Sequence, residues 1–176
     1  GNATFVGDLH VWVSPLPPSS QSAKRMYTIV GSGDGVGKNL NTGAWSAVAT
    51  NASWIRLNPE WETSPTIYVV DLSQNPDSIR ISNNGGATWA TRIAPANDID
   101  TFVVVDRDTV YATNGANFYK STNQCWTWEP AVAWTTSGSA VDMKVTADGT
   151  IFVSGTGVRK SSNGGASWST AGFYGH

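Results

Sequence analysis

Short runs of apolar or alternating residues, separated by polar turns, follow one another along the whole chain. The second run of each group is apolar on both faces, as in a strand that is covered on both sides of its sheet, whereas the first and third runs alternate. No helical period extends over a useful length, so the pattern predicts an all-β protein. Strand-like runs occur at 4–13, 26–30, 53–57, 66–70, 78–82, 101–105, 109–112, 140–145 and 150–153.

One eight-residue string returns at the end of these groups. The string is nearly identical in residues 161–168 (SSNGGASW) and 82–89 (SNNGGATW). A divergent copy, here called the worn copy, occupies 121–128 (STNQCWTW), and a form one residue shorter ends at Trp45. The spacing of the copies is about 40 residues, which indicates a repeat architecture with four short strands in each unit. Each group also has an aromatic residue at the same position of its second strand, namely Tyr27, Tyr68, Tyr111 and Phe152.

The string itself predicts a tight turn between two strands. Asn bonds to nearby backbone groups, and the glycines that follow it adopt the positive φ that side chains resist. Ser and Thr hydroxyls can bond the backbone groups that such a turn leaves unpaired, and the closing Trp buries about 150–250 Å² of surface. Cys125, the only cysteine, stands where two other copies have Gly, and we interpret it as a substituted turn residue rather than a reactive thiol.

These strings resemble the Asp-box, or bacterial neuraminidase repeat (BNR), with Asn in place of the usual Asp. The resemblance implies a β-propeller or part of one, in which each box is the turn between the third and fourth strands of a four-stranded antiparallel blade, away from the active site. Propellers of this kind include sialidases, xyloglucan-degrading hydrolases, sortilin-type receptors and photosystem assembly factors, so the resemblance implies architecture and leaves activity open. The structural residues of the boxes are Asn41, Trp45, Ser82, Asn84, Gly86, Thr88, Trp89, Ser121, Asn123, Trp128, Ser161, Asn163, Gly165, Ser167 and Trp168.

About four blades are expected in a single propeller or part of one, over residues 1–50, 51–94, 95–134 and 135–176. Because propellers typically have about four to eight blades, the chain is a small closed ring, half of a ring, an open arc or a piece of a longer chain. An open arc exposes blade faces that favour association. We therefore expect a homo-oligomer or a part of a larger surface assembly.

The composition is that of a folded extracellular domain. Hydrophobic residues make up 40% of the 176 residues and charged residues only 14%, while Ser, Thr, Asn and Gly are abundant. The net charge of -2 gives no electrostatic basis for binding nucleic acid or anionic membranes, and no apolar run is long enough for a membrane span. Asn2 and Asn51 begin formal N-glycosylation sequons. We expect a secreted or cell-surface protein.

The glycine-rich segment 31–38 lacks the residues of a nucleotide-binding loop. A P-loop requires Gly at Ser32 and Ser or Thr at Asn39, and a dinucleotide fingerprint requires Gly at Val36. We interpret the segment as a hairpin between the second and third strands of a blade. The sequence shows no metal-ligand spacing of His, Cys or carboxylates, so no metal or other cofactor is expected.

One end of the blades is the candidate functional face. In a propeller, the loops between second and third strands and the loops that lead to the next blade share a face opposite the boxes. Amides, carboxylates and a loop tryptophan there suit binding of a glycan or peptide, although solvated loops have the same composition. The candidate binding residues are Asp34, Asn75, Asp77, Asn97, Asp98, Asp100, Asn114, Asn117 and Trp134.

Glycoside hydrolysis requires two carboxylates about 5–10 Å apart across a cleft. Asp98 and Asp100 are the close pair expected on the candidate face, whereas the acidic pairs within 60–62 and 106–108 are expected at the box end. No catalytic residue is therefore assigned. We predict a non-enzymatic module with a structural, self-assembling or carbohydrate-binding role. The alternatives are a fragment of a sialidase- or xyloglucanase-like glycoside hydrolase and a receptor-like peptide-binding propeller.

Overall fold

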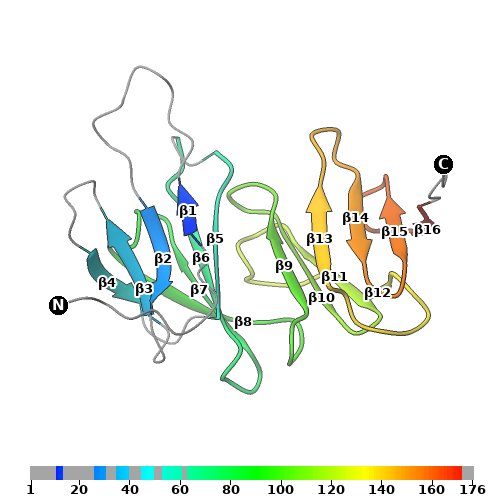
Figure 1. Ribbon diagram of the computed structural model, residues 1–176, viewed down its shortest axis with the longest axis horizontal. Helices are drawn as coiled ribbons and strands as arrows, with labels where there is room; N and C mark the ends of the chain where they lie inside the picture. The colour runs from blue at the N-terminus through cyan, green and yellow to red at the C-terminus, as the bar shows by residue number, and fades with distance from the viewer. Residues whose placement is uncertain are drawn as a thin grey trace. The chain divides into compact units, whose positions relative to one another are not determined.

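The computed structural model of the chain is all-β, as the sequence predicts (Figure 1). It describes the backbone of residues 11–13, 26–30, 35–39 and 45–49, and the side chains as well in 53–60 and 63–171. Within these residues, consecutive strands form four four-stranded antiparallel sheets. The chain divides into two compact units, Gly1–Arg92 and Ile93–His176. No described segment is a helix long and apolar enough to cross a membrane.

The first unit contains two sheets, each formed by strands in chain order. The first sheet, called sheet A, consists of β1 Val11–Val13, β2 Met26–Val30, β3 Gly35–Asn39 and β4 Trp45–Ala49. Sheet B consists of β5 Trp54–Leu57, β6 Ile67–Asp71, β7 Ser78–Ser82 and β8 Ala90–Ile93, whose last residue lies at the boundary between the units. Residues 35–38 of the glycine-rich segment belong to β3, which pairs with β2, and residues 31–34 lie outside the described residues.

The second unit repeats the arrangement. Sheet C consists of β9 Thr101–Val104, β10 Val110–Asn114, β11 Asn117–Ser121 and β12 Val132–Ala133. Sheet D consists of β13 Asp142–Val145, β14 Ile151–Ser154, β15 Val158–Ser161 and β16 Ser169–Thr170.

The aromatic residue of each second strand has the same place in its sheet. Its partner on the third strand is the residue just before the repeated string, as shown by the pairs Tyr68↔Ile81, Tyr111↔Lys120 and Phe152↔Lys160. In sheet A, Tyr27 pairs with Lys38 in the same way. The register therefore confirms that the four groups of strands are copies of one structural unit.

The second strands differ in how many of their faces are buried. All five residues of β6 are buried, and so are the first four of β10. In β14 the pattern alternates, with Ile151 and Val153 buried and Phe152 half-buried. Sheet D is thus covered on one face, although its second strand is as apolar as the others.

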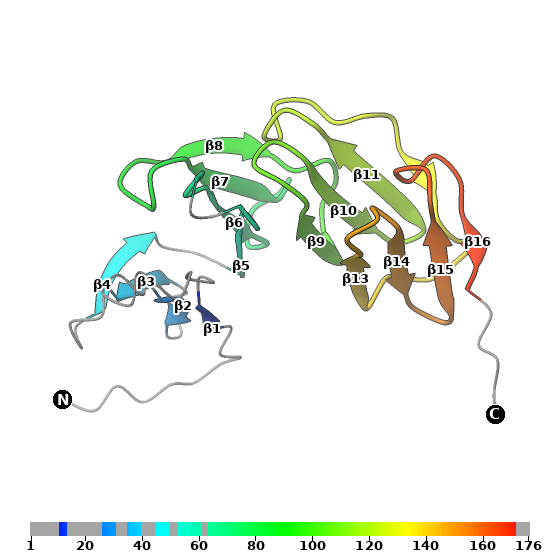
Figure 2. The ribbon, with the colours of Figure 1, turned by 90° about the horizontal axis from the view of Figure 1, so that it is seen from above.

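Sheets C and D pack face to face around the core of the second unit (Figure 2). Tyr111 and Phe118 from sheet C meet Met143, Ile151 and Val153 from sheet D. The Tyr111 and Phe118 rings lie 5.2 Å apart, and burial raises the pKa of the Tyr111 phenol. Full burial of each large apolar side chain contributes about 1.5–3 kcal/mol. This layer is therefore the main stabilising contact between the two sheets.

The other face of sheet D carries charge. Lys144 and Lys160 flank Phe152 across the strands. They lie on the face opposite Met143, because successive side chains of a strand point to opposite faces. The Lys144 ammonium lies 3.8 Å from the Asp142 carboxylate, and both side chains are well exposed. The corresponding face of sheet C has Val103, which packs in the core, at the position of Lys144. This face therefore lacks the apolar surface by which sheet C packs on its neighbour.

The repeated string forms a turn, here called the box turn, with the same hydrogen bonds in residues 82–89, 121–128 and 161–168. In the last copy, the Ser161 hydroxyl donates to Asn163 Oδ1 (2.8 Å) and accepts from the backbone N–H of Gly165 (2.9 Å). Asn163 Oδ1 also accepts from Ser167 N–H (3.0 Å), and its Nδ2 donates to the Ser167 hydroxyl (2.8 Å). The other two copies repeat these bonds within a few tenths of an ångström.

Each box turn requires two successive residues with positive φ. Gly164 and Gly165 have φ of 68° and 91°, and the glycines of the first described copy are similar. In the worn copy, Gln124 and Cys125 adopt φ of 56° and 59°. Cys125 is buried and its N–H donates to the serine hydroxyl as a glycine would, which supports its interpretation as a substituted turn residue.

The box turns lie at the same end of each sheet as the loop between the first and second strands. Gln124 bonds to Asp108 through both its backbone N–H (2.9 Å) and its side-chain amide (2.8 Å). In sheet B, Gly85 N–H donates to the Pro65 carbonyl (3.0 Å). Glu60, Asp106 and Asp108 therefore lie at the box end, as the sequence predicts, whereas Glu62 lies outside the described residues.

We expect Gly165→Ala to destabilise the protein far more than Gly164→Ala. A Cβ at Gly165 would overlap the Phe118 ring, whereas a Cβ at Gly164 would have open space. Both substitutions strain a positive-φ position, at about 1 kcal/mol, and only Gly165→Ala adds an overpacking cost, for a total of about 2–4 kcal/mol. Urea unfolding of the two variants measures the difference. Equal losses would contradict the packing of this turn on sheet C.

The box network predicts a different outcome for two substitutions of Asn163. Asn163→Ala removes every side-chain bond of this residue, and we expect a loss of about 1–3 kcal/mol in the free energy of unfolding. Asn163→Asp keeps the Oδ1 acceptor, and the Ser167 hydroxyl can rotate to donate to the second carboxylate oxygen. It should therefore unfold within about 1 kcal/mol of the parent at neutral pH. Equal damage from both changes would show that shape rather than hydrogen bonding stabilises the turn.

Candidate functional site

The end of the second unit opposite the box turns brings several predicted site residues together. Asn114, at the end of β10, donates from Nδ2 to the backbone carbonyls of Asn97 (2.7 Å) and Asp98 (3.0 Å). The Asp100 carboxylate accepts from Gly115 N–H at 2.7 Å. Two segments far apart in the sequence, the loop after β8 and the β10–β11 hairpin, are thereby tied to each other.

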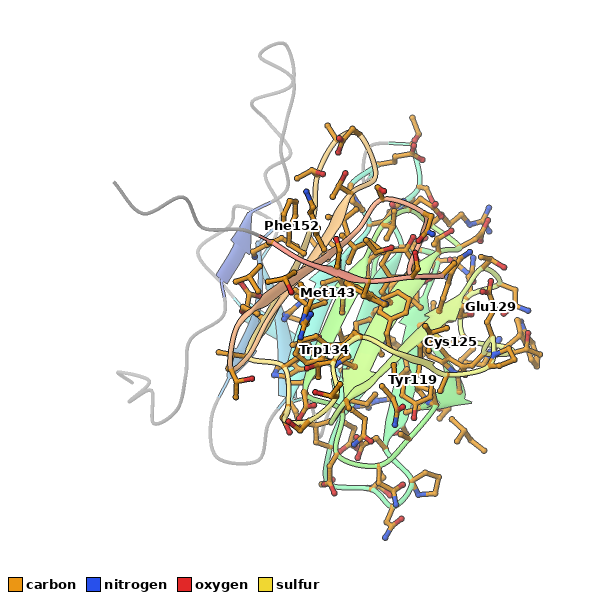
Figure 3. The ribbon with its side chains drawn as sticks, turned by 90° about the vertical axis from the view of Figure 1, so that its right-hand side faces the viewer. Tyr119, Cys125, Glu129, Trp134, Met143 and Phe152 are labelled. Carbon is orange, nitrogen blue, oxygen red and sulfur yellow. The ribbon has the colours of Figure 1, made fainter. Side chains whose placement is uncertain are left out.

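Trp134 belongs to the same cluster but is not an open loop residue. Its backbone N–H donates to the Ala116 carbonyl and its indole N–H donates to the Gly115 carbonyl, both at 2.9 Å. Only 3% of the residue is exposed, and the ring packs in the core with Met143 (Figure 3). The sequence predicts Trp134 on the loop face but does not predict that its side chain is buried. The signal that could have revealed it is that a buried indole N–H requires an acceptor.

Of the remaining predicted residues, Asn117 adjoins this cluster, and Asn75 and Asp77 belong to the first unit. Asn117 pairs with Asn114 across the hairpin. Asn75 and Asp77 belong to the connection between β6 and β7 in the first unit, where Asn75 is exposed and Asp77 is 1% exposed. Asp34 lies outside the described residues, as do Asn41 of the shortest box and both sequon asparagines, Asn2 and Asn51.

In the first unit, acidic and hydroxyl side chains at the corresponding end also bond to the backbone. Asp71 Oδ1 accepts from Ser73 N–H (3.0 Å) and from the Ser73 hydroxyl (2.6 Å). The Ser53 hydroxyl accepts from Leu72 N–H at 3.1 Å. At the end of the sheets opposite the box turns, Asp71 in the first unit and Asp100 in the second therefore both stabilise loop conformation through hydrogen bonds.

The box end has its own ordered carboxylates. Asp106 Oδ1 accepts from the N–H groups of Asp108 and Thr109, both at 2.8 Å, in the turn between β9 and β10. In the equivalent turn of sheet D, hydrogen bonds from Thr146 and Thr150 lower the pKa of the exposed Asp148 carboxyl. Among the described residues, no group of three or more His, Cys, Asp and Glu side chains is arranged to hold a metal ion.

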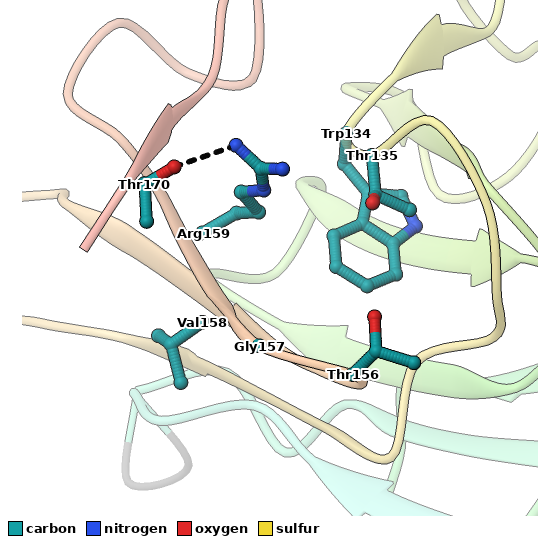
Figure 4. Close-up of a pocket in the computed structure, with 7 residues that line it drawn as sticks. All are labelled: Trp134, Thr135, Thr156, Gly157, Val158, Arg159 and Thr170. Atoms are coloured by element: carbon teal, nitrogen blue, oxygen red, sulfur yellow. Dashed lines mark hydrogen bonds between the residues drawn. The ribbon is translucent and has the colours of Figure 1, made fainter. Parts of the chain in front are cut away.

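The structure adds one site that sequence reasoning missed. A pocket of about 130 Å³ opens beside Trp134 and is bounded by the β14–β15 hairpin and the fourth strand of sheet D (Figure 4). Arg159 and Thr170 are its polar residues on the strands. They are neighbours because β15 and β16 pair, with Arg159 opposite Thr170. No local sequence pattern reports this pairing.

No protein-family model matches the sequence, and no curated protein sequence matches it either. Solved structures do match. A GH74 enzyme from Niastella koreensis superposes with a TM-score of 0.58 at 20% identity, over 90% of this chain and 30% of that protein. A GH74 xyloglucanase from Xanthomonas campestris gives 0.59 at 15% identity, over 93% of this chain and 32% of that one. A chain of a nidogen/laminin complex gives 0.60 at 17% identity, over 78% and 56%.

At these identities the likeness is one of fold. The chain spans about a third of the two GH74 proteins and just over half of the nidogen/laminin chain. Four-stranded antiparallel sheets in chain order, with box turns between third and fourth strands, are the blades of a propeller. The protein is therefore all-β, with the fold of a partial β-propeller.

Proposed function

We propose that this chain is a non-enzymatic propeller module of an extracellular or cell-surface protein, with a structural or binding role. The observation that carries the proposal concerns the end of the second unit opposite the box turns, here called the hairpin end. Side chains there form hydrogen bonds that hold neighbouring loops in place. Asp100, Asn114 and Trp134 all bond to the backbone of a neighbouring segment. A loop surface fixed in this way suits display to a partner, because little conformational entropy is lost on binding.

The same bonds weaken the case for hydrolysis by these residues. A general acid or base must reach the substrate and exchange its proton there. Asp100, the partner of Asp98 in the candidate acidic pair, accepts a hydrogen bond from Gly115 N–H at 2.7 Å, so its carboxylate is directed to the chain's own backbone. Asp98 itself is exposed and sits at a positive φ of 53°, as expected for a turn residue.

A role in assembly is supported by the charged face of sheet D. Lys144 and Lys160 are exposed on either side of the half-buried Phe152. A partly apolar centre with a charged rim is typical of a surface that associates with a polar partner. We propose that the chain forms a homo-oligomer, or joins a larger surface assembly, through this face. The match to a chain of a nidogen/laminin complex agrees with a propeller that acts through protein contacts.

Glycoside hydrolysis is the second candidate. It is favoured by the two GH74 matches, which cover 90% and 93% of this chain. Since this chain spans about a third of those enzymes, catalytic groups would have to come from further blades.

An extracellular location is supported by the low charged fraction of 14% and the abundance of Ser, Thr and Asn.

The loop ties can be tested by comparing Asp100→Ala with Asn97→Ala. Asp100→Ala leaves Gly115 N–H without its acceptor, and we expect a loss of about 1–2 kcal/mol in the free energy of unfolding. Asn97 is exposed and contributes its backbone carbonyl to the tie, so Asn97→Ala should change stability by less than about 0.5 kcal/mol. Urea unfolding of both variants measures the two losses in the free energy of unfolding. A neutral Asp100→Ala would contradict the role of Asp100 as a structural tie.

The proposed function is tested by light scattering and by incubation with xyloglucan. We expect a native mass above the 18.7 kDa of one chain at low salt. It should fall toward that value at high salt, because salt screens the attraction between the exposed lysines of sheet D and acidic residues of the adjoining copy in a head-to-tail contact. Lys144→Glu should lower the native mass at low salt in the same way. We expect no release of reducing sugar from xyloglucan. A monomer under all conditions would contradict assembly, and sugar release would show that this chain itself carries catalytic groups, which would contradict a non-enzymatic module.

A further inference from the structure

The pocket beside Trp134 combines a cation, hydroxyl groups and an apolar wall. Arg159 and Thr170 come from the paired strands β15 and β16, Thr156 from the β14–β15 hairpin, and Thr135 from the loop after β12 (Figure 4). All of these residues belong to the second unit. The pocket lies at the hairpin end of the sheet, on the side of sheet D that faces the core.

Arg159 is held in place but keeps most of its donors. Its Nη1 donates to the Thr170 hydroxyl at 2.7 Å, which orients the guanidinium into the pocket (Figure 4). Over residues 53–60 and 63–171, no carboxylate lies within ion-pair distance of this arginine, in contrast with Arg107, which lies 3.9 Å from Asp108. A fixed guanidinium with available N–H groups is suited to bidentate binding of a carboxylate.

Trp134 forms the apolar wall because its polar atom is already used. Its indole N–H donates to the Gly115 carbonyl, so the carbon edge of the ring faces the pocket. The ring fits there because residue 155 is glycine, since a Cβ at Gly155 would lie 2.9 Å from Trp134 Cη2. An apolar wall of this kind suits the carbon skeleton of a ligand rather than a bare ion.

Hydroxyl groups complete the lining. The Thr156 side chain is exposed at the mouth, with its hydroxyl directed toward the Trp134 ring (Figure 4). The Thr135 hydroxyl bonds weakly to the Ser137 carbonyl, at 3.3 Å. Threonine hydroxyls both donate and accept, so they match the hydroxyl groups of a ligand. The volume of about 130 Å³ equals about four water molecules, enough for a carboxylate and the adjoining carbons.

We propose that this pocket binds the carboxylate end of a hydroxylated carboxylate, the chemistry of a uronic acid. Arg159 binds the carboxylate, Thr156 bonds to a ligand hydroxyl, and Trp134 contacts the carbon skeleton. The site is separate from the charged outer face of sheet D, so its occupancy does not depend on association of the chain. Because the pocket is small and open, the affinity should lie in the millimolar range.

The test is a titration of the full chain, followed by the side-chain N–H signals of Arg159 and Trp134 in ¹H–¹⁵N NMR spectra. The probes are D-glucuronate, acetate and D-glucose. We expect glucuronate to shift both signals, acetate to shift Arg159 with lower affinity, and glucose to shift neither. Stronger binding of glucose than of glucuronate, or the absence of any shift with glucuronate, would overturn the proposal.

Variants separate the role of Arg159 from a general effect of charge. Arg159→Gln should weaken glucuronate binding by about tenfold or more, because charge-assisted hydrogen bonds are lost. Arg107→Gln changes the net charge equally and should leave the affinity unchanged. Equal weakening by both would indicate a nonspecific charge effect and would overturn the proposal.

A substitution at the mouth of the pocket keeps the test decisive if Arg159→Gln fails to fold. Thr156 is exposed, so Thr156→Val should leave the fold intact. We expect this variant to weaken glucuronate binding severalfold while acetate binding stays the same, because only glucuronate offers a hydroxyl group. Unchanged glucuronate binding would overturn the role of the threonine and the proposal of a hydroxylated ligand.

Discussion

A short hydrogen-bonded network between one serine and one asparagine side chain underlies each described box turn. The serine hydroxyl accepts a backbone N–H from a residue with positive φ, and the asparagine amide bonds to the serine hydroxyl and to the Ser or Thr four residues later. The network satisfies backbone groups that the reversal removes from the sheet ladder, which would otherwise cost about 1–3 kcal/mol each. The third and fourth strands of a blade are joined through it.

The box turn also contributes to packing between sheets. Gly165 lies against the Phe118 ring, and Trp168, which closes the same string, lies 5.1 Å from that ring in an edge-on arrangement. One element thus orders a turn of sheet D and covers the apolar face of sheet C. This dual role accounts for a glycine and a tryptophan in the same short motif. The outer face of sheet D has Lys144 in place of an apolar residue and is suited to a different kind of contact.

Polar residues at the hairpin end of the second unit have one of two roles: some hold the loops in place, and others line a pocket. The composition of the loops does not distinguish these roles. Asp100, Asn114 and Trp134 are polar or aromatic loop residues, and each is used to join segments of the chain itself. Arg159 and Thr156 are less conspicuous in the sequence, yet they line a pocket in which donors remain available. The proposed ligand site therefore uses side chains that are not needed to order the loops.

The sequence by itself determined the first and second strands of the repeats, the box turns and the equivalence of the repeats. Residues 4–10 of the predicted first strand lie outside the described residues. These features depend on local chemistry, since alternating apolar residues make strands, and an Asn followed by glycines makes a turn. The register of Tyr111 and Phe152 confirms the predicted repeat. Tertiary structure alone decided that Trp134 is buried, that Asp100 bonds to the backbone 15 residues away, and that Arg159 meets Thr170. Those outcomes require segments distant in the sequence to pack together, and no local pattern encodes which donors and acceptors then come within reach.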